Sequence, residues 1–303
     1  MIGELACLAA ALCWALAVAW FRAPIERYGS WAVNLAKNVL AAVLLGATAA
    51  AAGQLGVLAQ APALSIGLVA ASGVAGLTIG DTALFAAVGR LGVHRTLLLQ
   101  TLGPVFAAVL AHWALGETLS PRMLGGGLLV LAGVAVVVWT PRVDSGGDGA
   151  VDGSVDLARW DLVGIALGVL AAFGQGSGVV LAKRGMDDLP VLLASFVRLG
   201  AAVLGIVVVL AVAGRLRRAS VTLTSAPALG RLLGPTLLGT YLAFLLMMAG
   251  VAWAPASVAA VLLAVSPVFS LCLEAWMGVA PITWRSALGT ATAIAGVAVL
   301  TVA

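Results

Sequence analysis

The sequence Ala-Gly-Val-Ala-Val occurs at residues 132–136 and again at residues 295–299, each time inside a long apolar run. The two copies are 163 residues apart, and the same offset aligns residues 104–106 (Pro-Val-Phe) with residues 267–269. The alignment continues between these motifs without a gap. An internal repeat of this length predicts two structurally equivalent halves.

The composition identifies the solvent in which these halves fold. Of the 303 residues, 63% are hydrophobic and only 9% are charged, whereas a soluble domain has about 25% charged residues. The chain is therefore predicted to be an integral membrane protein without a large extramembranous domain. Cys7, Cys13 and Cys272 form no CxxC motif, which argues against a disulfide scaffold or a thiolate metal site.

Apolar runs bounded by charges, Pro or Gly predict ten membrane spans. They lie near residues 4–21, 31–52, 64–89, 92–115, 121–140, 161–181, 190–213, 231–252, 255–277 and 284–303. The fold class is therefore all-α, with ten transmembrane helices.

The Gly- and Asp-rich stretch 141–160 reads as a flexible linker between two five-helix repeats. The repeats occupy residues 1–140 and 161–303. Because five is odd, the second repeat must have the opposite orientation in the bilayer, an arrangement that recurs in secondary transporters.

Basic residues give the orientation. Eleven of the sixteen Lys and Arg residues lie in or beside odd-numbered connections, and three lie in or beside even-numbered ones. By the positive-inside rule the odd connections are cytoplasmic and both termini are outside. The net charge of +4 therefore describes membrane topology, and no nucleic-acid partner is expected.

Several motifs together resemble the ten-helix EamA-type branch of the drug/metabolite transporter superfamily. They are Gly-Asp-Thr-Ala-Leu-Phe at residues 80–85, Arg-Leu-Gly at 90–92, Thr-Leu-Gly-Pro at 101–104 and Leu-Gly-Glu at 115–117. The resemblance covers essentially the whole chain and implies secondary transport of small metabolites by alternating access.

The sequence departs from that pattern in two places. Ala280 stands where the repeat would place a second copy of Glu117. In the small four-helix multidrug relatives, a mid-membrane Glu in the first helix exchanges protons. Here Glu4 lies at the edge of the first span and Trp14 occupies its middle.

Charges inside a span are costly in hydrocarbon and mark candidate sites. Lys37, Asp81 and Gln100 are predicted to lie roughly 9 to 14 Å below the same membrane face, at ~1.5 Å per residue. The functional interpretation is a charged pair that lines a cavity, with Gln100 as a hydrogen-bond partner. The alternative is a buried salt bridge that only joins two spans, or a lysine that snorkels to the headgroups.

Arg198 is the repeat counterpart of Lys37, and the second half offers it no equivalent acid, because Phe244 replaces Asp81. Gln175 and Tyr241 are the polar groups expected near it. One interpretation is that Arg198 binds a substrate carboxylate or phosphate. The other is that it snorkels, with Gln175 as its hydrogen-bond partner.

Three further features complete the sequence prediction. Pro104 and Pro267 lie at matching mid-span positions and predict either paired hinges or static kinks. Trp14 either walls the cavity or packs in the interior. The glycine pairs in the fifth and tenth spans predict a scaffold or a homodimer face: Gly126 with Gly133, and Gly289 with Gly296.

The predicted function is secondary transport, with export as the expected direction, of a small polar or amphipathic metabolite across the cytoplasmic membrane. The expected partners are the substrate, the lipid bilayer, a coupling proton or ion, and a second copy in a homodimer. No cofactor, metal or catalytic residue is expected, because no Ser/His/Asp set shares a depth. The alternatives are a lipid-carrier flippase of the same superfamily, a membrane-embedded enzyme and a membrane scaffold.

Overall fold

We describe the protein from a computed structural model. The structure describes residues 2–115, 121–138, 161–186, 188–253, 262–263, 265–278 and 282–301. The predicted linker 141–160 lies outside the described residues, as do Glu117 and Ala280.

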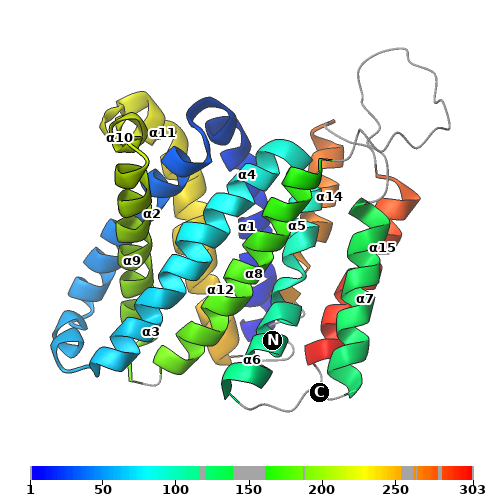
Figure 1. The fold of residues 1–303 in the computed structure, drawn as a ribbon, viewed down its shortest axis with the longest axis horizontal. Helices are drawn as coiled ribbons and strands as arrows, with labels where there is room; N and C mark the ends of the chain where they lie inside the picture. Colours follow the sequence, from blue (N-terminus) through cyan, green and yellow to red (C-terminus); the bar gives the residue numbers. More distant parts are fainter. Residues whose placement is uncertain are drawn as a thin grey trace.

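The described chain is a bundle of helices (Figure 1). In the first half these are α1 (Ile2–Tyr28), α2 (Ser30–Ala51), η1 (Leu55–Ala59), α3 (Ala63–Gly73), η2 (Val74–Gly80), α4 (Asp81–Leu91), α5 (Val93–Gln100), α6 (Gly103–Leu115) and α7 (Pro121–Val138). In the second half they are α8 (Leu162–Gly185), α9 (Val191–Val212), α10 (Leu216–Thr224), α11 (Ala226–Pro235), η4 (Thr236–Leu242), α12 (Ala243–Trp253), α14 (Ser266–Trp276) and α15 (Trp284–Thr301).

Within these described ranges, seven helical stretches are long and apolar enough to cross a membrane. They correspond to the predicted spans one to four and six to eight. The predicted spans five, nine and ten overlap α7, α14 and α15, of which α14 is described over only 11 residues. An all-helical, multi-pass membrane protein is confirmed, and the count of ten spans stays a prediction.

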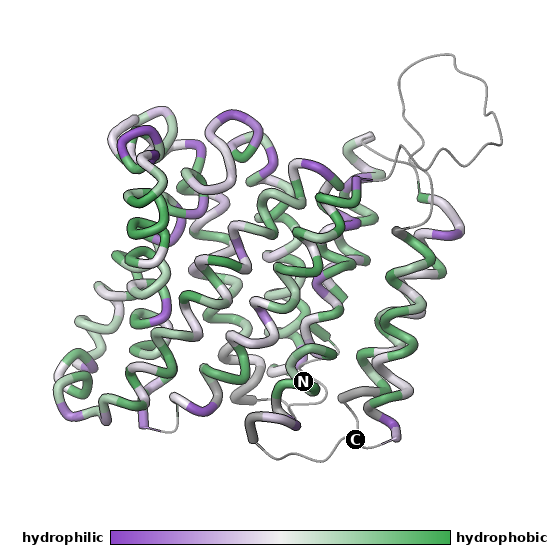
Figure 2. The backbone as a smooth tube through the Cα atoms, viewed as in Figure 1, coloured by the Kyte–Doolittle hydropathy of each residue, from purple (hydrophilic) through white to green (hydrophobic). Residues whose placement is uncertain are grey.

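The hydropathy of the residues changes along the long direction of the bundle. Hydrophobic residues dominate the middle of the bundle, and hydrophilic residues gather at its ends (Figure 2). Both ends of the chain lie at one end of the bundle, opposite α10 and the turn between α1 and α2 (Figure 1). α10, which carries Arg217 and Arg218, therefore lies at the end of the bundle away from the termini, and the orientation of the termini in the membrane stays a prediction.

Gly92 makes the sharp turn that was expected between the third and fourth spans. Its φ of 81° lies in the left-handed region, which costs a glycine little. α4 ends at Leu91 and α5 begins at Val93, so one residue reverses the chain. This hairpin returns the chain through the bilayer directly after the segment that carries Asp81.

The sequence predicts continuous α-helices for the third and eighth spans, but the structure interrupts both. Each contains a π-helical segment of seven residues, η2 and η4. The two segments begin 162 residues apart, at Val74 and Thr236, so the irregularity recurs at equivalent positions of the two halves. π-Helical turns are rare and occur frequently at functional sites.

Each of the two π-helical segments packs against the opposite half of the chain. η2 packs against α8 and α9 of the second half, and η4 packs against α1 and α2 of the first. Thr78 in η2 donates a hydrogen bond to the carbonyl oxygen of Ala202 at 3.1 Å. Tyr241 in η4 shares one with Thr48 at 2.9 Å. Each segment is therefore tied by a hydroxyl group to a helix of the opposite half.

The glycine pairs of the fifth and tenth spans face each other within one chain. α7 and α15 lie side by side at the edge of the bundle (Figure 1). A Cβ atom at Gly133 would collide with the backbone of Gly289 and Ala293, and one at Gly296 would collide with Gly126 and Val130. Small residues thus permit close packing where lipid supplies no hydrophobic drive. These glycine faces pair α7 with α15, which is the scaffold role.

Candidate functional site

Lys37 on α2 and Asp81 at the start of α4 form an ion pair inside the bundle. Nζ of Lys37 donates to Oδ2 of Asp81 at 2.6 Å, and the two side chains are 1% and 2% exposed. Lys37 is seven residues into α2, roughly 10 Å along the helix, so the pair lies at a depth where ions are costly unless paired. The structure therefore brings together the two charges that the sequence placed at a common depth.

Polar side chains extend this pair on both sides. Nζ of Lys37 also donates to Oδ1 of Asn38 at 3.0 Å, and Nδ2 of Asn38 donates to Oδ1 of Asn34 at 2.9 Å. Nδ2 of Asn34 then reaches Oγ1 of Thr82 at 2.7 Å. The sequence reasoning missed these neutral groups. Their signal was the spacing 34, 37 and 38, which puts three polar side chains on one face of α2.

Gln175 on α8 completes the coordination of Asp81. Its Nε2 donates to Oδ1 of Asp81 at 2.7 Å, so both carboxylate oxygens accept hydrogen bonds. The sequence reasoning had assigned this role to Gln100 and had paired Gln175 with Arg198. In the structure, Nε2 of Gln100 is buried without a hydrogen-bond partner among the described residues. α8 reaches Asp81 because it packs against both α4 and η2.

Arg198 on α9 lies beside this network but outside its hydrogen bonds. The residue is 7% exposed, and its Nε has no partner within the described part of the chain. Its guanidinium carbon lies 5.9 Å from the ring centre of Phe244. A methyl group on Gly76 would lie 3.5 Å from Nη2 of Arg198 and 3.8 Å from Oε1 of Gln175. Gly76 therefore marks the point where Arg198 approaches the network.

The position of Arg198 depends on Gly73, and this gives a first prediction. A Cβ atom at Gly73 would collide with the carbonyl oxygen of Arg198, whereas one at Gly67 on the same helix would meet nothing within 4 Å. We expect Gly73→Ala to destabilise the protein by about 1–3 kcal/mol, as overpacking does. Gly67→Ala should be neutral or slightly stabilising, because alanine favours helix. Unfolding by SDS titration in mixed micelles measures both variants, and equal stabilities would contradict the close approach of α3 and α9.

The two aromatic residues predicted for the site, Tyr241 and Trp14, pack against different apolar clusters. Tyr241 lies in η4 against the apolar cluster of Ala41, Leu45 and Leu199, with its hydroxyl on Thr48. Tyr241 therefore packs against the cluster that contains Leu199, the residue that follows Arg198 in the chain. Trp14 on α1 packs partly buried against the largest apolar cluster, which matches interior packing.

The sequence places Pro104 and Pro267 in the middle of two spans. In the structure, neither proline lies inside a continuous helix. α6 begins at Gly103 and α14 begins at Ser266, so each proline falls in the first turn of a helix. There a proline leaves no intrahelical hydrogen bond unmade. The turn before each contains a hydrogen bond between residues three apart: the N–H of Leu102 donates to the carbonyl oxygen of Leu99, and the N–H of Val265 donates to that of Leu262. The breaks occur at matching places in the two halves.

Glu274 on α14 forms a second buried polar contact between the halves. Its Oε1 accepts hydrogen bonds from the backbone N–H groups of Val93 and His94, at 2.9 and 3.0 Å. These are the first donors of α5, where the helix dipole favours a carboxylate. The His94 ring lies 3.1 Å from the carbonyl oxygen of Pro267 and 3.4 Å from Oγ of Ser270. Glu274 itself is only 7% exposed, so this carboxylate lies inside the bundle.

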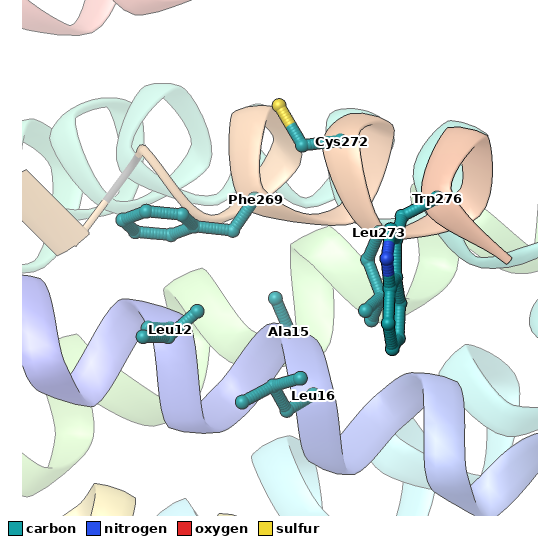
Figure 3. Close-up of a pocket in the computed structure, with 7 residues that line it drawn as sticks. All are labelled: Leu12, Ala15, Leu16, Phe269, Cys272, Leu273 and Trp276. Carbon is teal, nitrogen blue, oxygen red and sulfur yellow. The ribbon is translucent and has the colours of Figure 1, made fainter.

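An apolar groove lies between α1 and α14 (Figure 3). Its volume is about 240 Å³, and its walls are Leu12, Ala15, Leu16, Phe269, Cys272, Leu273 and Trp276. Trp276 and Leu273 reach toward α1, whereas the sulfur of Cys272 points away from it (Figure 3). The surface of the groove is almost entirely apolar.

The chemistry of the site is that of ion pairing and hydrogen bonding. In the described residues no group of three His, Cys, Asp or Glu side chains could hold a metal ion. The polar groups come from α2, α4, α8 and α9, so they join both halves of the chain.

A bundle of apolar helices with a buried polar network defines a multi-pass membrane protein. The profile of the "EamA-like transporter family" matches residues 1–139 and 162–302. The chain belongs to this family of membrane transporters, as the motifs had indicated.

Two further comparisons concern individual proteins. A solved structure titled only "Crystal structure of protein" has a TM-score of 0.63 and 19% sequence identity, and the match covers 99% of this chain and 96% of that one. At this identity the similarity shows the fold alone. Among curated proteins, none matches this chain significantly.

Proposed function

We propose that the protein is a secondary transporter that exports a small polar or amphipathic metabolite across the cytoplasmic membrane by alternating access. The observation that carries the proposal is the network of Lys37, Asp81 and Gln175 beside Arg198, buried within membrane-spanning helices. Ionisable groups at such depth are expensive and belong to substrate or ion pathways by default.

The substrate site in this proposal is formed by Lys37, Asp81, Gln100, Arg198, Gln175, Tyr241 and Trp14. Two inverted five-helix repeats, with both termini of the chain outside the cell, rock against each other around it. The helix breaks before Pro104 and Pro267 act as hinges, since their turns lack regular α-helical hydrogen bonding. A proton or ion bound in the network supplies the coupling.

Export is tested by untargeted mass spectrometry of the medium from cells that express the wild type or Arg198→Gln at matched levels. We expect one small solute to accumulate outside only with the wild type. Arg217→Gln is the control, because Arg217 is an exposed arginine on α10 and should export normally. Equal media from wild-type and empty-vector cells would overturn export, and a reporter fused after Ala303 that is active in the cytoplasm would overturn the orientation.

A lipid-carrier flippase is the second candidate, and the groove between α1 and α14 favours it. Its lining is apolar, as an acyl chain would require, and Arg198 would then hold a headgroup. In that case the solute in the medium stays constant, and the difference between wild type and Arg198→Gln appears in the membrane extract.

A further inference from the structure

The guanidinium of Arg198 is a buried cation with an unsatisfied donor. The residue is 7% exposed, and its Nε is buried without a hydrogen-bond partner among the described residues. Its described contact is the face of Phe244, at 5.9 Å. Buried charges in proteins are normally paired, and an arginine does not relieve the cost by losing its proton. An anion bound at the guanidinium would satisfy both its charge and this donor.

The nearby acid cannot supply that anion. Asp81 belongs to the neighbouring network, where its Oδ2 is held by Lys37 at 2.6 Å and its Oδ1 by Gln175 at 2.7 Å. The cluster holds two cations and one carboxylate. It carries one uncompensated positive charge, which a ligand with one negative charge would neutralise.

Gly76 is the closest backbone approach to the guanidinium that glycine spacing reveals. It presents no side chain to Nη2 of Arg198, and an added methyl group would lie 3.5 Å from that atom, at an ordinary contact distance. The ring centre of Phe244 lies 5.9 Å from the guanidinium carbon, so the cation also has an apolar neighbour. The planar guanidinium offers donors in a fork that matches a carboxylate.

We infer that the proposed transport site binds a monocarboxylate, an acid that carries one carboxylate and no ammonium group, through Arg198. This inference rests on the proposed function and narrows its substrate class. A phosphate monoester carries about 1.5 to 2 negative charges at pH 7 and would overcompensate the cluster.

A zwitterionic amino acid is excluded by the same count of charges. Its ammonium group would need a second acid inside the bundle. Among the described residues the buried acids are Asp81 and Glu274, and Glu274 already accepts hydrogen bonds from Val93 and His94. The network therefore has a place for the carboxylate and none for the ammonium group.

The inference is tested by ligand-induced thermal stabilisation of the purified, detergent-solubilised full chain. The probes are straight-chain monocarboxylates from acetate to octanoate and 3-phenylpropionate, with 3-phenylpropionamide, phenylalanine and inorganic phosphate as comparisons. We expect at least one monocarboxylate to raise the melting temperature, and no comparison compound to do so. Arg198→Gln should weaken binding by about 10- to 100-fold, the range for hydrogen bonds to a charged group, and Arg198→Lys should retain part of the affinity.

The unliganded variants separate a binding role from a structural one. Removing an unpaired buried charge should leave the melting temperature of ligand-free Arg198→Gln equal to or above that of the wild type. A marked decrease would mean that Arg198 holds the fold together, and the inference would fail. Stabilisation by phenylalanine or phosphate that Arg198→Gln abolishes would also overturn it, as would the absence of stabilisation by every monocarboxylate.

The two proposals fail in distinguishable ways. If the wild type exports a solute without a carboxylate, transport stands and the substrate class is wrong. The other case is that monocarboxylates bind through Arg198 while the medium and the membrane extract are the same for the wild type and Arg198→Gln. In that case the monocarboxylate class of ligand stands, and secondary export is wrong.

Discussion

Asp81→Asn is expected to abolish transport and to destabilise the protein by about 3–5 kcal/mol, the usual cost of removing one partner from a buried ion pair. The substitution keeps the size of the side chain and an oxygen that Gln175 can reach. It leaves Nζ of Lys37 charged, buried and without its acid, with Asn38 as the remaining acceptor. SDS titration in mixed micelles measures the stability, and the export assay measures the activity.

Two controls show whether burial causes the loss. Arg22→Gln breaks an ion pair whose side chains are 41% and 57% exposed, and should cost less than about 1 kcal/mol. The double variant Lys37→Gln with Asp81→Asn removes both charges, and should recover stability relative to Asp81→Asn without recovering transport. If Asp81→Asn were as stable as Arg22→Gln, the pair would not carry the energy that its burial implies.

Glu274→Leu is expected to produce the second large effect. It removes the acceptor for the N–H groups of Val93 and His94, and each buried donor left unsatisfied costs about 1–3 kcal/mol. A loss of about 2–6 kcal/mol should follow, measured by the same SDS titration. Glu274→Gln should lose less, because the amide oxygen can still accept both hydrogen bonds.

The contact also joins the two halves, so its loss should change the motion as well as the stability. α14 belongs to the second half and α5 to the first, and Glu274 ties them at the start of α5. A cysteine introduced at Thr96, which is buried in α5, should react faster with a membrane-impermeant maleimide in Glu274→Gln than in an otherwise wild-type background. Equal labelling rates would mean that the contact is a static support.

The fold of this protein was largely predictable because its signals are local. The composition required a membrane protein, and the repeated motif around Gly133 and Gly296 predicted equivalent halves. The π-helical segments η2 and η4 were not predictable, since neither Val74 nor Thr236 begins a pattern that differs from an ordinary apolar helix. They depend on packing against the opposite half.

The candidate site was predictable only where charge revealed it. Lys37 and Asp81 were placed together because both are ions at one depth in neighbouring spans. Gln175 was paired with Arg198 because both belong to the second half, but packing of α8 on α4 carries it to Asp81. Asn34 and Asn38 could not be assigned to the site from the sequence, because a neutral amide inside a span costs less than an ion and is a weaker sign of a functional site.

The close pairing of α7 with α15 has a consequence for how the protein is made. Gly133 and Gly289, which meet in this contact, lie 156 residues apart in the chain. At about 5–20 residues per second, a ribosome needs roughly 8–30 s to synthesise the intervening chain. During that interval α7 stands in the bilayer with its glycine face uncovered. Nascent chains that stop before α15 therefore leave this glycine face without its partner helix, and the insertion of α15 covers it.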